Sequence, residues 1–346
     1  MTAQAPSRIV RFGAGTIESL GEVCAEAAIE RPVLVTTRAG AARAGDVAVV
    51  GRYDGVRSHV PVETVREACA LVRAVEADGL VGLGGGSSID TCKAVVAALA
   101  EDGETGLPRI VAVPTTYAGA EWTPFFGMLL EPGTKAGGSS GHATPIAAIY
   151  DPELTLDLPL DVTVGTGMNA LAHCAEAYYH PDRTARAERH ADTGATAIAY
   201  ALPLVVSKPT GIYGRTRLLE GAYRAALALA DSGPCLGHAM AQALGGRYGL
   251  PQGAMNALCL PAALRFNEAV VPEAIARFGA ALGTDDAPAR VEELAALGGF
   301  GRLRELGVVE GELDEVAHAI AKRPGARANP RPASSDEIAG LLRSLW

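Results

Sequence analysis

Hydrophobic and polar positions follow different patterns in the two halves of the chain. In the first half, short runs of β-branched and apolar residues alternate with stretches in which apolar residues recur every three or four positions. This alternation is typical of βαβ units, which build a mostly parallel sheet. The runs 31–37, 46–50, 79–83 and 109–113 predict strands, and 62–77 predicts a helix.

The second half carries a purely helical pattern. After about Asp157 the strand signal disappears, and stretches rich in Ala and Leu, such as 191–205 and 218–230, are separated by Gly and Pro. Two prolines punctuate the polar segment 150–159, which we take as the joint. The sequence therefore predicts an α/β domain of residues 1–155, Rossmann-like with a mostly parallel sheet, and an all-helical domain of residues 156–346.

Size and composition narrow the class of protein. A chain of 346 residues exceeds what one hydrophobic core usually supports, and 49% hydrophobic residues exclude a disordered chain. The formal net charge of −9 argues against nucleic acid or an anionic membrane as the main partner, so small molecules are expected. Six cysteines without CxxC spacing, and an amino terminus without a signal-type apolar core, predict a soluble cytoplasmic protein with reduced thiols.

A glycine-rich turn follows the third predicted strand. The run Gly84, Gly85, Gly86, Ser87 enters a helical stretch, and glycines let a backbone approach a diphosphate closely. Ser87 and Ser88 are expected to cap the helix, whose amino end attracts anions. The run matches neither GxGxxG nor GxxxxGK[ST], so a simple tight turn is the alternative interpretation.

A second polar segment follows the fourth predicted strand. Thr115, Thr116 and Tyr117 come directly after it, at the edge where open α/β sheets bind ligands. Their hydroxyls can reach a ribose or an amide of a bound nucleotide. An ordinary polar loop is the alternative.

These motifs resemble a known family. GGGSxxDxxK, ending at Lys93, is similar to the turn of iron-containing alcohol dehydrogenases, glycerol dehydrogenases and dehydroquinate synthases. Segments along nearly the whole chain resemble the maleylacetate reductase branch: 10–16, 114–121, 149–152, 167–173 with Glu176, 244–246 and 329–332. Dehydroquinate synthase itself fits poorly, because its lysine-rich segments and HTxGHA helix are absent. The resemblance implies the dehydroquinate synthase-like fold of iron-containing alcohol dehydrogenases and a homodimer.

The resemblance also assigns residues to an NAD(P)H cofactor. It implies that the pyrophosphate contacts Gly85, Gly86 and Ser87, that Asp90 and Lys93 brace the helix start, and that Thr115, Thr116 and Lys135 lie near the nicotinamide riboside. At the end of the second strand, where NAD-specific members carry an acid, this chain has Thr37 followed by Arg38. Since Thr37 cannot repel a 2′-phosphate and Arg38 can pair with one, NADH and NADPH both remain open.

The implied metal site departs from the family pattern. Iron-containing alcohol dehydrogenases bind a divalent metal through one Asp and three His, and the aligned residues here are Asn169, His173, His238 and Gln252. Carboxamides are weak ligands, and two imidazoles without an anion suit neither iron nor zinc. We expect weak metal binding or none. As alternatives, the histidines are hydrogen-bonded core residues and Gln252 is a pocket wall.

The proton path is also altered. Gln242 stands where the family has the second histidine of an HxxxH helix, and glutamine cannot act as a general acid. His173 and His238 are the expected hydrogen-bond donors to substrate, with Gln242 as a direct contact or a pocket wall. Tyrosines are further candidate donors, or else packing residues: Tyr117, which we take as catalytic, and Tyr178, Tyr179 and Tyr248.

Three functions follow from these residues. The first is an NAD(P)H-dependent reductase that transfers hydride to an activated carbonyl or conjugated enone, without a tightly bound metal. The second is a non-redox enzyme of specialised metabolism on the same scaffold: a lyase, dehydratase or cyclase. The third is a binding protein or assembly partner without catalytic activity.

Overall fold

The computed structural model describes residues 8–44, 47–131 and 134–346, and leaves the side chains of residues 131 and 134–136 undescribed. The chain forms two compact units. Unit 1 consists of Met1–Thr116 and Ala120–Thr155, and unit 2 of Tyr117–Gly119 and Leu156–Trp346.

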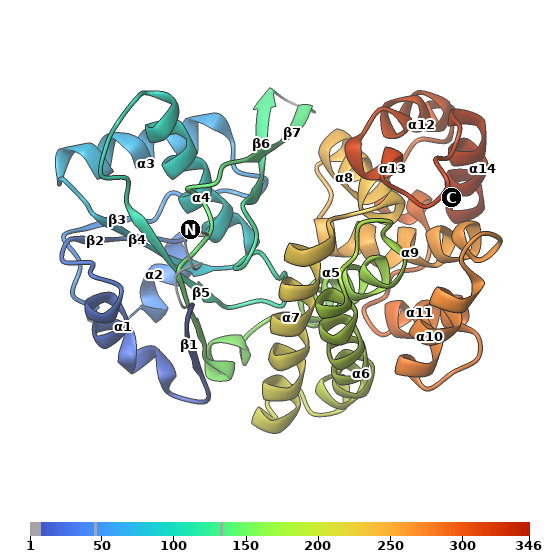
Figure 1. Ribbon diagram of the computed structural model, residues 1–346, viewed down its shortest axis with the longest axis horizontal. Coiled ribbons are helices and arrows are strands. Elements are labelled where there is room, and N and C mark those ends of the chain that lie inside the picture. Colours follow the sequence, from blue (N-terminus) through green and yellow to red (C-terminus); the bar gives the residue numbers. More distant parts are fainter. Residues whose placement is uncertain (1–7, 45–46, 132–133) are drawn as a thin grey trace. The chain divides into compact units, whose positions relative to one another are not determined.

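Unit 1 is built on a six-stranded sheet in which every paired strand is parallel (Figure 1). The strand order is β1-β8-β5-β4-β2-β3. The strands are β1 (Ile9–Phe12), β2 (Pro32–Val35), β3 (Gly51–Tyr53), β4 (Gly79–Gly84), β5 (Arg109–Pro114) and β8 (Ala147–Tyr150). A separate antiparallel hairpin pairs β6 (Phe125–Glu131) with β7 (Thr134–Ser139).

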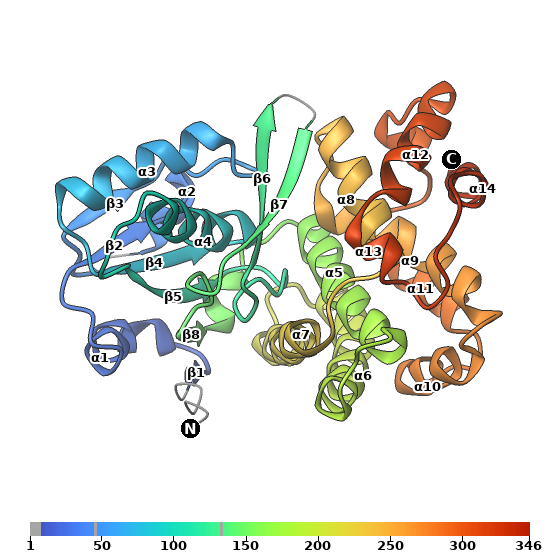
Figure 2. The ribbon, with the colours of Figure 1, turned by 45° about the horizontal axis from the view of Figure 1, so that its top comes forward.

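Helices cover both faces of this sheet (Figure 2). Successive strand residues point to opposite faces, so Val33 and Val35 pack with α3 (Val62–Ala74) and α4 (Gly86–Glu101). Leu34, between them, packs instead with α1 (Leu20–Glu26). The short helix α2 (Arg38–Arg43) follows β2. Burial on both faces explains why the strands read as nearly continuous apolar runs.

The predicted α/β class is confirmed, and the differences are local. Strands at 31–37, 79–83 and 109–113 are present as β2, β4 and β5, and the helix at 62–77 ends at Ala74. The strand predicted at 46–50 is wrong. Val47 and Val49 only pack against the core, while the ladder with β2 starts where Gly51 pairs with Val33; Asp46 lies outside the described residues. The sequence analysis did not predict β1, β8 or the hairpin.

A buried lysine ties the hairpin to the glycine-turn helix. Lys93 of α4 is fully buried, and its ammonium donates to the carbonyls of Ala120 (2.5 Å) and Phe125 (2.8 Å) and to the Thr123 hydroxyl (3.1 Å). Asp90 lies 3.6 Å from the same ammonium and accepts from the backbone N–H of Gly127. Burial lowers the pKa of Lys93, and the Asp90 charge opposes that shift. These contacts join the hairpin to α4, and the role of Asp90 and Lys93 beside a bound cofactor stays a prediction.

The regular secondary structure of unit 2 is helical wherever its residues are described (Figure 1). The long helices are α5 (Leu160–Tyr179), α6 (Ala185–Ser207), α7 (Ile212–Ser232), α8 (Leu236–Tyr248) and α9 (Gln252–Glu268). They are followed by α10 (Pro272–Leu282), α11 (Ala287–Ala296), α12 (Leu313–Ala321), α13 (Pro324–Arg327) and α14 (Ser335–Leu345). The predicted helices 191–205 and 218–230 lie within α6 and α7. Among the described residues, no helix has both the length and the apolar character that a membrane span requires.

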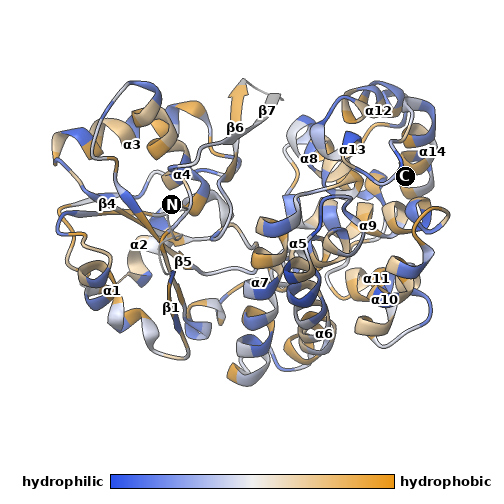
Figure 3. Ribbon diagram, in the orientation of Figure 1, coloured by the Kyte–Doolittle hydropathy of each residue, from blue (hydrophilic) through white to orange (hydrophobic). Residues whose placement is uncertain are grey.

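Small residues allow these helices to approach closely. A methyl group at Gly194 of α6 would lie 2.8 Å from Cys174 Sγ on α5 and 3.2 Å from the Gly221 carbonyl on α7. The helix faces that meet in the interior are apolar, whereas polar residues gather on the outer faces (Figure 3). Close contact of α5, α6 and α7 fixes the helix that carries the candidate chemistry.

We expect Lys93→Met to destabilise the protein by about 2–4 kcal/mol, because it removes the donor to three oxygens and the buried cation next to Asp90. The measurement is urea-induced unfolding. Lys322→Met, at an exposed site, is the matched control and should change stability by less than about 0.5 kcal/mol. Equal stability of the two variants would contradict this account.

Candidate active site

The glycine turn leaves the amino end of α4 open. Gly84 has φ +146, a conformation that favours glycine, and a methyl group there would lie 2.4 Å from Ser88 Oγ. The N-cap residue is Gly85, and no side chain caps the helix. The expectation that Ser87 and Ser88 cap it is therefore wrong, because both already lie in the first turn. Uncapped N–H groups at a helix amino end are suited to bind a phosphate.

The threonines after β5 lie beside this turn. The Thr115 backbone N–H donates to the Gly84 carbonyl, and a methyl group at Gly85 would approach Thr116 Cγ2 to 3.1 Å. At the end of β2, the Thr37 hydroxyl accepts from Gly40 N–H and caps α2. The side chain of Lys135, on β7, lies outside the described residues. The turn of unit 1 thus fits a dinucleotide, while the individual contacts stay predictions.

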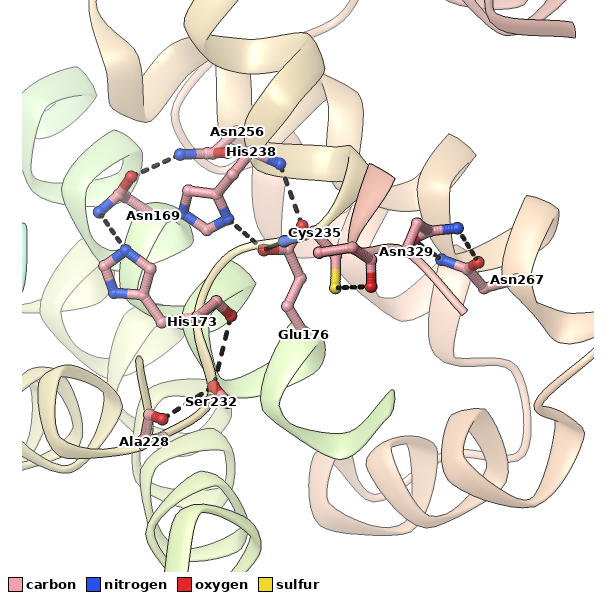
Figure 4. Close-up of polar contacts among 12 residues, drawn as sticks. Asn169, His173, Glu176, Ala228, Ser232, Cys235, His238, Asn256, Asn267 and Asn329 are labelled. Carbon is pink, nitrogen blue, oxygen red and sulfur yellow. Dashed lines mark hydrogen bonds and ion pairs between the residues drawn. The ribbon is translucent and has the colours of Figure 1, made fainter. Parts of the chain in front are cut away.

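Two stacked histidines form the centre of unit 2 (Figure 4). His173 of α5 and His238 of α8 are both 4% exposed, and their ring centroids lie 4.7 Å apart with an interplanar angle of 15°. Asn169 is four residues before His173 and so shares its face of α5. The sequence prediction that these three residues belong together agrees with this geometry.

Glu176 holds His238 in place. This carboxylate of α5 is fully buried and accepts from His238 Nδ1 (2.7 Å), from the His238 backbone N–H (3.0 Å) and from the Cys235 backbone N–H (2.6 Å). It therefore caps the amino end of α8, where a negative charge is favourable. The contact places a proton on His238 Nδ1 and turns Nε2 away from the carboxylate.

Asn169 orients His173. Its amide nitrogen donates to the Ala118 carbonyl (2.7 Å) and lies 3.3 Å from His173 Nε2, while its oxygen accepts from the Asn256 amide of α9. A neutral His173 then carries its proton on Nδ1. Burial, and secondly the charge of His238, lower the pKa of His173 well below its usual value, so this ring is neutral at physiological pH.

Each histidine keeps one ring nitrogen without a partner. His173 Nδ1 and His238 Nε2 are buried and make no hydrogen bond to any described residue. Leaving a buried polar atom unpaired costs about 1–3 kcal/mol, so a ligand that pairs both is favoured. Gly119 keeps one of them accessible, since it has φ +76 and a methyl group there would lie 3.1 Å from His173 Nδ1. The pair is therefore arranged to meet a polar atom of a ligand.

The four positions aligned with the metal ligands do not assemble a donor set. Among the described residues, no group of three or more His, Cys, Asp or Glu is placed to hold a metal ion. His173 Nε2 faces an N–H of Asn169, whose oxygen is turned toward Asn256. The Gln252 oxygen lies 3.7 Å from the Cβ position of Gly245, about two helical turns beyond His238. These residues do not fit a tightly bound iron or zinc.

The other catalytic candidates have different surroundings. Gln242 lies one turn after His238 on α8, and its oxygen accepts from Arg323 (3.4 Å). The Tyr117 hydroxyl is fully buried and accepts from Arg215 (3.2 Å), which also donates to Thr163. These contacts place Tyr117 as an anchor of the segment 117–119, and its role as a donor to substrate stays a prediction. Tyr178 donates to Asp192, Tyr248 donates to Glu312, and Tyr179 is buried.

Sequence analysis gave no role in this centre to Glu176, Asn256 or Arg323. Glu176 is three residues after His173, so its place on the same face of α5 could have been anticipated. Asn256 and Arg323 carry no local signal, because tertiary packing alone brings them to Asn169 and Gln242.

Comparisons with known proteins agree with this architecture. The family model for iron-containing alcohol dehydrogenase matches residues 6–152, and that for the C-terminal part of the Fe-containing alcohol dehydrogenase family matches residues 163–346. The chain is 36% identical over 345 residues to a maleylacetate reductase of Pseudomonas knackmussii, covering 97% of this chain and 95% of that protein. It is 38% identical over 298 residues to maleylacetate reductase 1 of Rhodococcus opacus, covering 86% and 81%.

A crystal structure gives the same result. The maleylacetate reductase of Agrobacterium tumefaciens superposes with a TM-score of 0.87 at 32% identity, covering 99% of this chain and 97% of that one. These findings confirm the predicted fold and the enzyme class, an NAD(P)H-dependent oxidoreductase, and nothing in them favours the non-redox alternative. The matches cover both halves of the chain, and the chain therefore belongs to the iron-containing alcohol dehydrogenase family.

Proposed function

We propose that this enzyme reduces an activated carbonyl or a conjugated enone, of the kind that maleylacetate represents, without a tightly bound metal. The observation that carries the proposal is the pair of unpartnered ring nitrogens, His173 Nδ1 and His238 Nε2. Hydride addition to a carbonyl or enone places negative charge on an oxygen, and preorganised donors stabilise such charge. The names of the relatives support the substrate class.

The glycine turn supplies the cofactor site in this proposal. Gly85, Gly86 and Ser87 would hold the pyrophosphate, with Thr115 and Thr116 beside it. Lys135 would approach the nicotinamide ribose, and Asp90 would brace the helix. The bound nicotinamide supplies the hydride. A neutral Thr37 at the end of β2 accepts either NADH or NADPH.

The histidine pair would replace the metal as the stabiliser of the oxyanion. His173, neutral and protonated on Nδ1, donates one hydrogen bond. His238, whose ring the buried Glu176 carboxylate holds in place, directs its second ring nitrogen toward the substrate. Gln242, one turn further along α8, contacts the substrate, and Tyr117 holds the segment that contains Gly119. The aligned metal positions Asn169 and Gln252 act here as polar packing residues.

We further propose that the enzyme works in the cytoplasm as a homodimer. All six cysteines are buried and free, which suits a reducing compartment. Size-exclusion chromatography with light scattering would test the dimer.

Gly85→Ala should weaken NADH or NADPH binding by about tenfold or more, because a methyl group at the turn narrows the approach of the diphosphate. The measurement is a fluorescence titration of the reduced cofactor. Gly21→Ala on α1, where a methyl group meets open space, is the matched control and should leave affinity unchanged. No cofactor binding by the wild-type protein would refute the reductase.

Glu176→Gln should lower kcat by about 10–100-fold, because the NH2 group of the amide cannot accept the N–H groups that hold His238 in place. Cofactor affinity should remain at the wild-type value. Glu293→Gln, an exposed substitution, serves as the control. Wild-type kcat in Glu176→Gln would contradict this orienting role of Glu176.

The purified enzyme should carry substoichiometric metal and keep its activity after dialysis against a chelator, since the donor set does not fit iron or zinc. Elemental mass spectrometry and activity assays on one sample check this. The double substitution Asn169→Asp, Gln252→His should raise metal content. Activity that disappears with chelation and returns with Fe²⁺ or Zn²⁺ would contradict the proposal.

A further inference from the structure

Arg323 carries a charge for which no described residue supplies a counter-charge. It lies in the turn between α12 and α13 and is half-buried. Its guanidinium donates to the Gln242 oxygen at 3.4 Å, and no acidic side chain of the described residues pairs with it. Arg247 of α8 shows the contrast, because it binds both Glu312 and Glu315.

Burying a guanidinium without a counter-charge is unfavourable. Desolvation by burial, acting alone, lowers the pKa of Arg323, yet a guanidinium stays protonated at any physiological pH. A partly buried cation without an anion loses hydration, and no Coulombic attraction offsets that loss. A bound anion would restore the balance.

The backbone fixes this cation near the histidine pair. A methyl group at Gly325 would lie 2.8 Å from the Cys235 carbonyl, so α13 presses directly on the start of α8 (Figure 2). Gln242, which receives the Arg323 hydrogen bond, is four residues after His238. Residues at this spacing on a helix lie side by side, with Cβ atoms about 5–6 Å apart. Through Gln242, Arg323 is therefore linked to the face of α8 that carries His238.

We propose that Arg323 and Gln242 form a carboxylate-binding site that selects substrates bearing an acid group next to the reducible carbonyl or enone. The inference rests on the proposed reductase function for the identity of the ligand as substrate. The planar guanidinium binds a carboxylate through two parallel N–H groups. The Gln242 oxygen accepts from Arg323, so the two amide N–H groups of Gln242 are left as further donors to the same anion.

Binding of maleate, an unreactive dicarboxylate, tests the site without turnover. By isothermal titration calorimetry the wild type should bind maleate at least about tenfold more tightly than dimethyl maleate. Arg323→Met should abolish that preference, Arg323→Lys should keep part of it, and Arg327→Met, at an exposed arginine of α13, should keep all of it. Equal affinity of the wild type for diacid and diester would overturn the proposal even if Arg323→Met failed to fold.

Turnover separates this inference from the proposed function. With NADH or NADPH, Arg323→Met should raise KM for a 4-oxo-2-enoate by about 10–100-fold and leave KM for its methyl ester within about twofold. Equal effects on acid and ester, or none on either, would overturn the carboxylate site while the reductase stands. If the wild type reduced neither compound, the reductase would fail, and the maleate titration would still decide whether Arg323 binds carboxylates.

Discussion

The buried carboxylate of Glu176 is the interaction on which the chemistry of unit 2 depends. It is fully buried on α5 and accepts hydrogen bonds from three N–H groups, two of them from the backbone at the start of α8. A buried charge is tolerated only when hydrogen bonds and favourable dipoles surround it, and the open helix end supplies both. The same contact that joins α5 to α8 therefore sets the orientation of His238.

A short segment connects this centre to the strand that precedes it in the chain. Thr116 lies beside Gly85 of the glycine turn within unit 1, and the next three residues belong to unit 2. There Ala118 accepts from Asn169, and Gly119 borders His173. The polar loop after β5, read from the sequence as a nucleotide contact, thus also helps to orient a histidine.

The sequence predicted features that rest on local periodicity and missed those that rest on long-range packing. Alternating apolar runs located β2, β4 and β5, and four-residue spacing placed Asn169 with His173, because helix and strand geometry alone determine these relations. The shift of β3 to Gly51 follows from pairing with β2, which no local pattern records. The contact of Arg323 with Gln242 joins positions 81 residues apart, so only the fold could reveal it.

The stacked histidines cannot both carry charge, and this constraint divides their roles. With centroids 4.7 Å apart, two imidazolium rings would repel each other strongly in a buried site. Of the two rings, only His238 contacts the Glu176 carboxylate, and His173 stays neutral with Asn169 on its Nε2. One ring is therefore held by an anion and the other by an amide, so the fold fixes the direction in which each unpartnered ring nitrogen points.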